Sequence, residues 1–253
     1  MSSLKTPPSG SLSPAPAAPP RPVPTLDELE EMVAEPDRRV VIRDVDYAFY
    51  EQLVDSIPEW RHIHVDFDGK DLEVMSPGLL HDGDKQLLGQ LVEAIAQVLR
   101  IPYKSAGQTT WKRPEIARGL EADETYFFQR DKLDLVAVSK ARRAKDIAAY
   151  PNPDLAIEVD VSPSKVDRAG IYAAMQVPEV WRFDGDELVI DQLGDDGRYH
   201  SALKSRFLPV TTEQVRRWVV DEDSSDESEW ARRLRAWARA EVAPRREDQR
   251  EEA

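Results

Sequence analysis

The stretch "YPNPDLAIEVDVSPSK", residues 150–165, combines three carboxylates, Asp154, Glu158 and Asp160, with the apolar and β-branched composition of a buried strand. Successive side chains of a strand face opposite sides, so Glu158 and Asp160 share one face, opposite Leu155, Ile157, Val159 and Val161. Two carboxylates side by side in a half-buried strand repel each other and lose solvation, unless a cation or a hydrogen-bond donor compensates. The stretch therefore predicts an acidic site on a strand whose other face is core.

Strand and helix patterns surround this stretch. Strand composition recurs near residues 104–111, 120–128 and 133–138 and within 177–202, and an Asp68-Gly69 turn predicts a hairpin over 61–75. Helical spacing or capping patterns predict helices over 25–35, 44–57, 84–99, 166–175, 211–220 and 230–242. We expect an α/β domain with a mixed central sheet flanked by helices.

The domain is expected to span residues 25–221, with an extension at each end. Residues 1–24 are rich in proline and poor in large apolar side chains, which predicts a disordered arm. Residues 222–253 combine an acidic linker with an amphipathic helix that carries Trp230, Leu234 and Trp237 on one stripe.

Composition excludes several classes of function. The absence of cysteine rules out disulfides, thiolate catalysis and cysteine-bound zinc. No apolar run is long enough to span a bilayer and no signal peptide is visible, so we expect a cytoplasmic protein without membrane contact. A formal net charge of -14 means that any nucleic-acid site must be a local basic patch.

Acids on a second strand suggest a metal site. Glu121 and Asp123 lie in the strand-like segment "GLEADETYFF", and acids on two strands could converge with Glu158 on one ion. Oxygen ligands of this kind suit Mg²⁺ or Mn²⁺. The alternative interpretation is that the acidic face of the strand is exposed to solvent and that its charges are structural.

The order of three segments adds a resemblance. "GLEADETYFF", then "NPDLAIEVDVSPSKVDR", then "IYAAMQVPEVWRFDGDELVIDQLGDDGRY" resemble the Uma-two family of restriction endonucleases, part of the PD-(D/E)xK nuclease superfamily, over residues 40–215. The resemblance implies a restriction-endonuclease-like fold and metal-dependent hydrolysis of phosphodiester bonds.

The resemblance also implies roles for single residues. Asp123 matches the first acid, with Ala122 where the family has proline, and Glu158 matches the second acid. Asp160 stands where the superfamily has lysine, so the basic residue would come from the following helix. Lys165 is preferred over Arg168, because its point charge and tunable pKa suit water activation. His81 matches a histidine that is frequent in the family at this place. The resemblance thus predicts Asp123, Glu158 and Asp160 as ligands of Mg²⁺ or Mn²⁺ and Lys165 as the catalytic residue that positions or activates water. His81 and Arg168 are predicted as accessory residues.

Two short basic runs are candidates for contacts to a nucleic-acid backbone. They contain Lys112 and Arg113 in "TWKR", and Arg142 and Arg143 in "SKARRAK". Solvated loops are the competing interpretation for both runs. His62 and His64 also have the spacing of a metal-binding pair, but a closed zinc site needs four ligands and no others lie nearby in the sequence.

The favoured function is a Mg²⁺-dependent endonuclease acting on DNA. The alternative is a catalytically inactive nuclease fold that serves as a module for nucleic-acid or protein interaction, which the missing adjacent lysine and the acidic composition favour. An acid/base hydrolase would need two carboxyl groups facing each other across a cleft, which neighbouring strand positions do not provide. Cleavage of both DNA strands needs two active sites, and this motivates a homodimer.

Overall fold

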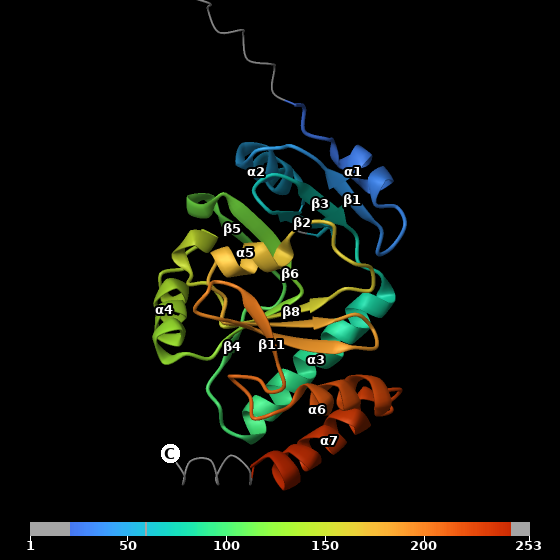
Figure 1. Ribbon diagram of the computed structural model, residues 1–253, viewed down its shortest axis with the longest axis vertical. Coiled ribbons are helices and arrows are strands. Elements are labelled where there is room, and N and C mark those ends of the chain that lie inside the picture. Colours follow the sequence, from blue (N-terminus) through green and yellow to red (C-terminus); the bar gives the residue numbers. More distant parts are fainter. Residues whose placement is uncertain (1–20, 59, 244–253) are drawn as a thin grey trace, which may run out of the picture.

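Two β-sheets form the body of the protein, and the computed structural model describes residues 21–58 and 60–243. Most of the predicted amino-terminal arm, and the end of the carboxyl-terminal segment, lie outside the described residues. In Figure 1, helices α1 and α2 lie above one sheet, and α6 and α7 lie at the opposite end of the molecule. None of the described helices has both the length and the apolar character needed to cross a membrane.

The first sheet, sheet A, is antiparallel and has the strand order β1-β3-β2-β6-β5. Its strands are β1 (Arg39–Ile42), β2 (His64–Phe67), β3 (Leu72–Met75), β5 (Thr109–Arg113) and β6 (Arg118–Ala122). The predicted Asp68-Gly69 hairpin joins β2 to β3, with Gly69 at φ +96°. Such a backbone angle favours glycine, because a Cβ atom is strained there.

Helices α1 (Leu26–Met32) and α2 (Tyr47–Ser56) share an apolar cluster with sheet A. The capping box of Thr25 and Glu28 that the sequence predicts is present at the start of α1. Asp46 caps α2 by accepting a hydrogen bond from the Phe49 backbone N–H, at 2.9 Å.

The second sheet, sheet B, is mixed, as predicted. Its order is β11-β10-β9-β8-β7-β4, and only the β8–β9 pair is parallel. The strands are β4 (Lys104–Ser105), β7 (Glu124–Phe127), β8 (Leu155–Val159), β9 (Glu179–Phe183), β10 (Leu188–Leu193) and β11 (Tyr199–Ala202). Helix α5 (Arg168–Ala174) forms the crossover between β8 and β9, which parallel neighbours require.

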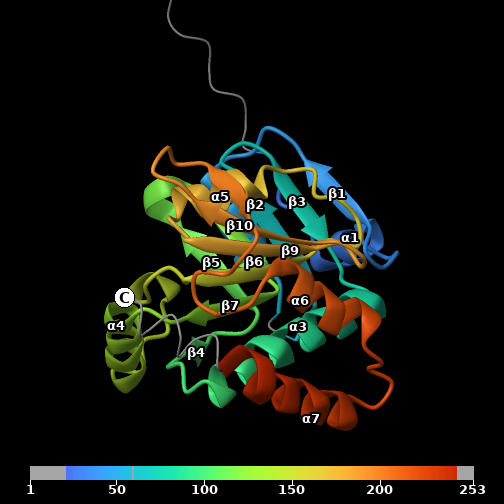
Figure 2. The ribbon, with the colours of Figure 1, turned by 60° about the horizontal axis from the view of Figure 1, so that its bottom comes forward.

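Helices cover both faces of sheet B, with α5 on one side and α3, α6 and α7 on the other (Figure 2). Leu155, Ile157 and Val159 of β8 belong to one buried cluster with α3 (Leu79–Val98), whereas Ala156 belongs to another with α5. The alternation predicted for this strand is therefore confirmed up to Val159, where β8 ends.

The carboxyl-terminal helices pack on the domain itself. They are α6 (Thr212–Arg216), a π-helical turn (Arg217–Asp221), α7 (Glu227–Trp237) and a second π-helical turn (Ala238–Val242). The predicted stripe of Trp230, Leu234 and Trp237 is buried in the same cluster as α3. The Trp230 indole N–H donates to the Trp218 carbonyl at 2.9 Å.

Three predictions for secondary structure need correction. Residues 133–138 lie in helix α4 (Arg130–Ala141) rather than in a strand. The apolar pattern of "LDLVAV" is too short to distinguish the two-residue period of a strand from the 3.6-residue period of a helix. Leu135 and Val138 are exposed on the helix surface. Helix α3 begins at Leu79, five residues before the predicted start. Short 3₁₀ helices occur at Pro114–Ile116 and Ile147–Ala149.

The third correction concerns the two segments that pass between the sheets. The strand predicted near 104–111 is divided into β4 in sheet B and β5 in sheet A, with Gly107 at φ +61° between them. The strand predicted near 120–128 is divided into β6 in sheet A and β7 in sheet B. The one residue between β6 and β7 is Asp123, so this acid lies at the junction of the two sheets.

Candidate active site

Asp123 is buried at the junction between the sheets, with 1% of its surface exposed. Its Oδ2 accepts a hydrogen bond from the Val159 backbone N–H at 2.7 Å, which ties the junction to the end of β8. Its Oδ1 lies 3.2 Å from Nε2 of His81 and 3.7 Å from Nδ1 of His64. Among the described residues, no hydrogen bond of good geometry reaches this Oδ1.

The surroundings of Asp123 favour its charged form. Burial alone would raise the pKa of Asp123, but contact with His81, together with the nearby His64 ring and the Arg168 guanidinium, outweighs burial and lowers the pKa to about 2. Burial opposes the charged form of His81 too, yet Asp123 and Asp82 raise the pKa of His81. Asp123 is therefore a carboxylate at neutral pH, and its Oδ1 accepts no hydrogen bond from the described residues.

His64 links Asp123 to a neighbouring acid. Burial lowers the pKa of His64 despite the nearby Asp123 and Glu121, so the ring is neutral at neutral pH. The Gln108 side-chain amide lies 2.8 Å from Nε2 of His64 and 2.5 Å from Oε1 of Glu121. An amide that donates to Nε2 leaves the ring hydrogen on Nδ1, the nitrogen that faces Asp123.

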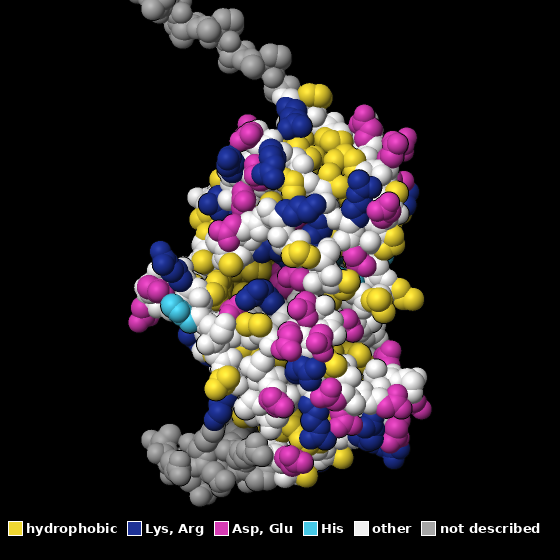
Figure 3. Space-filling view, turned by 45° about the vertical axis from the view of Figure 1, so that its right-hand side comes forward, with side chains coloured by type: hydrophobic (Ala, Val, Ile, Leu, Met, Phe, Trp, Pro, Cys, Tyr) yellow, Lys and Arg dark blue, Asp and Glu magenta, His cyan; other side chains and the backbone are white. Residues whose placement is uncertain are grey.

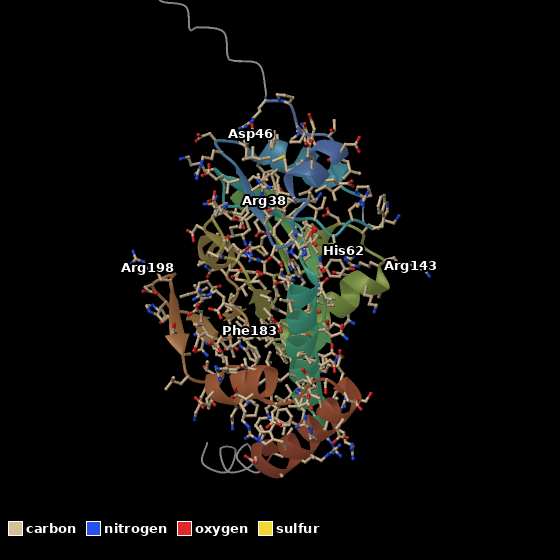
Figure 4. All side chains as sticks on the ribbon, turned by 90° about the vertical axis from the view of Figure 1, so that its right-hand side faces the viewer. Arg38, Asp46, His62, Arg143, Phe183 and Arg198 are labelled. Atoms are coloured by element: carbon tan, nitrogen blue, oxygen red, sulfur yellow. The ribbon has the colours of Figure 1, made fainter. Side chains whose placement is uncertain are left out.

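The histidine pair considered for zinc does not form. His62 is exposed and precedes β2, whereas His64 is buried within β2. Figure 4 labels His62 near the upper end of α3. In residues 21–58 and 60–243, no group of three or more acid or imidazole side chains is placed to hold a metal ion.

Glu158 is also buried, with 1% of its surface exposed, and both of its oxygens have partners. Arg168 contacts Oε2 and the Tyr172 hydroxyl donates to Oε1. The interpretation that this strand face is open to solvent is therefore wrong for Glu158. The Tyr172 ring is buried, while its hydroxyl reaches Glu158.

One guanidinium joins three carboxylates. Besides Glu158, Arg168 donates from Nη1 to Oδ1 of Asp160 at 2.8 Å, and its Nε lies 3.1 Å from Oδ2 of Asp66. Arg168 itself is only 8% exposed. Asp66 of β2 was not identified from the sequence. The signal for it is the pairing of Asp66 with Glu73 across the β2–β3 hairpin, which places two acids opposite each other.

The pKa values around Arg168 follow from burial. Burial raises the pKa of Glu158 well above its usual range; Arg168 opposes this shift, and the acids Asp123, Asp160 and Asp66 reinforce it. Burial likewise raises the pKa of Asp66 to about 6, against the charge of Arg168. Burial disfavours the charged form of Arg168, but the surrounding carboxylates raise the pKa of its guanidinium, so Arg168 stays positive.

Lys165 does not join the acids. Its Nζ donates to the Arg39 carbonyl at 2.8 Å, and its backbone N–H donates to Oε2 of Glu73 at 2.6 Å. Arg39 in turn donates to Oε1 of Glu73 at 2.6 Å and to Oδ1 of Asp160 at 2.8 Å. These contacts hold the segment after β8 against sheet A. Of the two basic residues considered, the structure places Arg168, and not the preferred Lys165, among the acids.

The oxygen atoms of the acids suit a divalent ion chemically, but the acids that the structure describes are not arranged around a common point where an ion could bind. Asp123, Glu158 and Asp160 supply hard oxygen donors, and Oδ1 of Asp123 is buried without a hydrogen bond. Both oxygens of Glu158, however, are engaged by Arg168 and Tyr172. An ion could share Glu158 only if Arg168 moved away from it.

The residues considered for nucleic-acid contact fall into two groups. Arg113 is 3% exposed, and its guanidinium donates to Asn152 and to the carbonyls of Ile147 and Tyr150, so it is not available to a phosphate. Lys112 is paired with Asp55 at 2.6 Å. Arg142 and Arg143 are exposed beyond α4, and Figure 4 shows Arg143 projecting from the side of the molecule. On the face seen in Figure 3, basic and acidic side chains are interspersed.

Comparison with known proteins agrees with the resemblance stated above. No curated protein matches this chain. One solved structure that it resembles is described as "a putative nuclease belonging to DUF820 from Anabaena variabilis"; the identity is 12%, the TM-score is 0.45, and the similarity covers 70% of this chain and 99% of that chain. Residues 48–214 match the model of the Uma2 family, described as "Putative restriction endonuclease". Since the match covers more than half of the sequence, the chain belongs to the Uma2 family.

Proposed function

We propose that this protein is an endonuclease that hydrolyses phosphodiester bonds of DNA with Mg²⁺ or Mn²⁺. The observation that carries the proposal is the placement of Asp123 at the junction of the two sheets, next to the β7–β8 pair that contains Glu158: it is a buried, charged carboxylate, and its Oδ1 accepts no hydrogen bond from the described residues. The family match supports the class of reaction.

The acids that would hold the ion are Asp123, Glu158 and Asp160. A bound divalent ion supplies polarisation of the scissile phosphate and a bound water of lowered pKa. His81 keeps Asp123 ionised and fixes the orientation of its carboxylate, 3.2 Å away. Arg168 remains charged at neutral pH, and its planar guanidinium has the geometry for two parallel hydrogen bonds to phosphate oxygens, which a lysine lacks; it could use them only after releasing Glu158 and Asp160.

The engagement of Glu158 favours a second candidate function. Because Arg168 and Tyr172 satisfy both carboxylate oxygens from within the protein, the acid cluster is compensated without a metal ion. A catalytically inactive nuclease fold that serves as a nucleic-acid or protein interaction module would have such a closed site. The two candidates differ in whether Arg168 yields Glu158 to an ion.

The remaining assignments from the sequence are part of the same proposal. They comprise a domain over residues 25–221 with a separate arm and tail, a cytoplasmic location, and a homodimer. Arg142 and Arg143 remain the proposed backbone contacts, since both are exposed. Helix α7 packs against α3 of its own domain, so the apolar stripe of α7 is already covered and another surface would form the dimer.

Cleavage of supercoiled plasmid with Mg²⁺ or Mn²⁺ tests the proposal. The intact protein is expected to nick the plasmid, whereas Asp123→Asn and Glu158→Gln are expected to lose the activity. Asp195→Asn, which makes the same acid-to-amide change on the surface, serves as the matched control and keeps the activity. Inactivity of the intact protein with both metals on DNA would support the interaction module, and equal activity of all variants would place the reaction elsewhere.

A further inference from the structure

A hollow of about 410 Å³ lies beside the Asp123 side of the site, between α2, β2 and the β5–β6 pair. Its walls are apolar and come from Val54, Ile57, Ile63 and Val65. Its polar floor consists of Gln108, Thr110 and Glu121. Pockets that bind small ligands commonly combine apolar walls with a few polar groups that fix orientation, and this hollow has the volume of such a pocket.

The floor of the hollow is organised around one carboxylate. Oε1 of Glu121 accepts from the Gln108 amide at 2.5 Å, and Oε2 accepts from the Thr110 hydroxyl at 2.9 Å. The Glu121 side chain is 17% exposed, so it is held in place while still reachable. A carboxylate accepts hydrogen bonds through further lone pairs but donates none. A ligand that reaches this floor must therefore present N–H or O–H donors.

One imidazole separates the floor from the acid of the site. Nε2 of His64 lies 3.7 Å from Oε1 of Glu121, and Nδ1 of the same ring lies 3.7 Å from Oδ1 of Asp123. Whatever occupies the hollow therefore lies next to the proposed reaction centre. A group that is covalently attached to a phosphodiester would be held close to it.

One residue that lines the hollow, Arg61, stacks on an exposed aromatic ring that lies outside the lining. Arg61 and His62 line the rim. The Arg61 guanidinium lies 4.3 Å from the centroid of the Trp60 ring, which is 66% exposed, and Arg61 also pairs with Glu30 at 2.6 Å. Exposed aromatic rings stacked with arginine are surfaces on which unpaired bases stack.

We propose that this hollow is a base-binding subsite that accepts nucleobases with an exocyclic amino group. The proposal rests on the proposed nuclease function and adds a base preference to it. Cytosine and adenine present amino donors to a carboxylate, and the amino group of guanine does so as well. Thymine presents O4, an acceptor, where the others present an amino group, and its base N–H, at N3, is flanked by two carbonyl oxygens that the Glu121 carboxylate repels, so thymine is disfavoured. The apolar walls would contact the faces of the base.

Binding of nucleosides tests the subsite without the polyanionic backbone. Deoxycytidine, deoxyadenosine, deoxyguanosine and thymidine are uncharged, so their dissociation constants with the intact protein, measured by NMR titration in the presence of EDTA, isolate recognition of the base. The amino-bearing nucleosides are expected to bind at least about 10-fold more tightly than thymidine, the discrimination of a good polar base contact. Equal affinities, or no binding by any nucleoside, would overturn the proposal.

Two variants locate the binding. Glu121→Gln replaces an acceptor by a side chain that also donates and is expected to remove the preference over thymidine, because its amide N–H can pair with O4. Ile57→Phe fills the hollow from its wall and is expected to weaken binding of all the nucleosides, with folding checked by circular dichroism. Unchanged affinities in both variants would place the nucleosides elsewhere. Cleavage of plasmid by intact protein without base preference would overturn the subsite alone, whereas selective nucleoside binding without cleavage would overturn the nuclease function alone.

Discussion

The two acids of the candidate site are equally buried, Asp123 at the junction between β6 and β7 and Glu158 in β8, yet their surroundings differ. Asp123 faces His81 and His64, its pKa is lowered to about 2, and one of its oxygens lacks a hydrogen bond. Glu158 faces Arg168 and Tyr172, its pKa is raised, and both of its oxygens are engaged.

This difference shows that burial alone does not fix the state of an acid. Asp123 stays charged because contact with His81 and the nearby His64 and Arg168 outweigh burial, and the Val159 N–H donates to its other oxygen. Glu158 shares the Arg168 guanidinium with Asp66 and Asp160, and Asp160 also pairs with Arg39. Among the described residues, Asp123 thus keeps one oxygen that accepts no hydrogen bond, whereas both oxygens of Glu158 are engaged from within the protein.

Removing the charge of Arg168 should have the largest effect on stability. Arg168→Met leaves Glu158, Asp160 and Asp66 without their shared partner, and loss of one member of a buried ion pair costs about 3–5 kcal/mol. Urea denaturation monitored by tryptophan fluorescence measures the change. Arg182→Met is the matched control: this arginine pairs with Asp191, but its side chain is 51% exposed, so the expected loss is below about 1 kcal/mol. Equal losses in the two variants would contradict a special role for Arg168.

The pH dependence of stability should separate the two sides of the site. Because the pKa of folded Asp66 is about 6 and that of the unfolded residue is near 3.8, the folded protein binds the additional proton between these values. Its contribution to stability is present below about pH 4 and lost as pH rises through 6, by up to roughly 3 kcal/mol. Asp123, with its lowered pKa, contributes in the opposite sense: its contribution is present above about pH 4 and lost as pH falls toward 2.

Denaturation of Asp66→Asn and of Asp123→Asn at several pH values checks both signs. Between pH 4 and pH 6 the unfolding free energy of the intact protein should fall relative to that of Asp66→Asn. The difference in unfolding free energy between Asp123→Asn and the intact protein should shrink as the pH is lowered below 4. Parallel pH profiles for both variants would show that the two acids do not differ in charge state.

Activity should depend most on the Asp123 side. If the protein is a nuclease, Asp123→Asn is expected to lower the cleavage rate by at least about 100-fold, the typical effect of removing one charge-stabilising group from an active site. His81→Gln, which removes the charge next to Asp123, is expected to have a smaller effect and to shift the acid limb of the pH–rate profile upward, because the pKa of Asp123 is no longer held down by His81. An unshifted profile would contradict the positioning role of His81.

The smallest effect is expected for Lys165. Lys165→Ala removes one hydrogen bond to the Arg39 carbonyl, worth about 1 kcal/mol of stability, and should leave the cleavage rate within about 2-fold. A loss of activity as large as that of Asp123→Asn would show that the lysine, and not Arg168, serves the acids.

Patterns of the sequence identify most of the elements and the principal acids. The alternation of residues 155–159 locates β8 and the buried face, and the order of motifs indicates the family. Single-strand patterns do not reveal a division between sheets. The sequence of β6 and β7 reads as one continuous strand, and only the three-dimensional pairing separates the two at Asp123. Which of the two basic residues contacts Glu158 depends on the direction in which the chain enters α5. The sequence alone, with Lys165 and Arg168 three positions apart, does not show that Arg168 makes this contact.

The most direct test of this account is Mn²⁺ binding measured by electron paramagnetic resonance of free Mn²⁺. Arg168 and a divalent ion are expected to compete for Glu158, while Asp123 serves the ion alone. Arg168→Met should bind Mn²⁺ about 10-fold or more tightly than the intact protein, and Arg168→Lys should show a smaller gain. A tenfold change in the dissociation constant corresponds to about 1.4 kcal/mol of binding free energy. Asp123→Asn should lose this site. Equal affinity in all four proteins would mean that the ion binds elsewhere and that Asp123 and Glu158 do not form a metal centre.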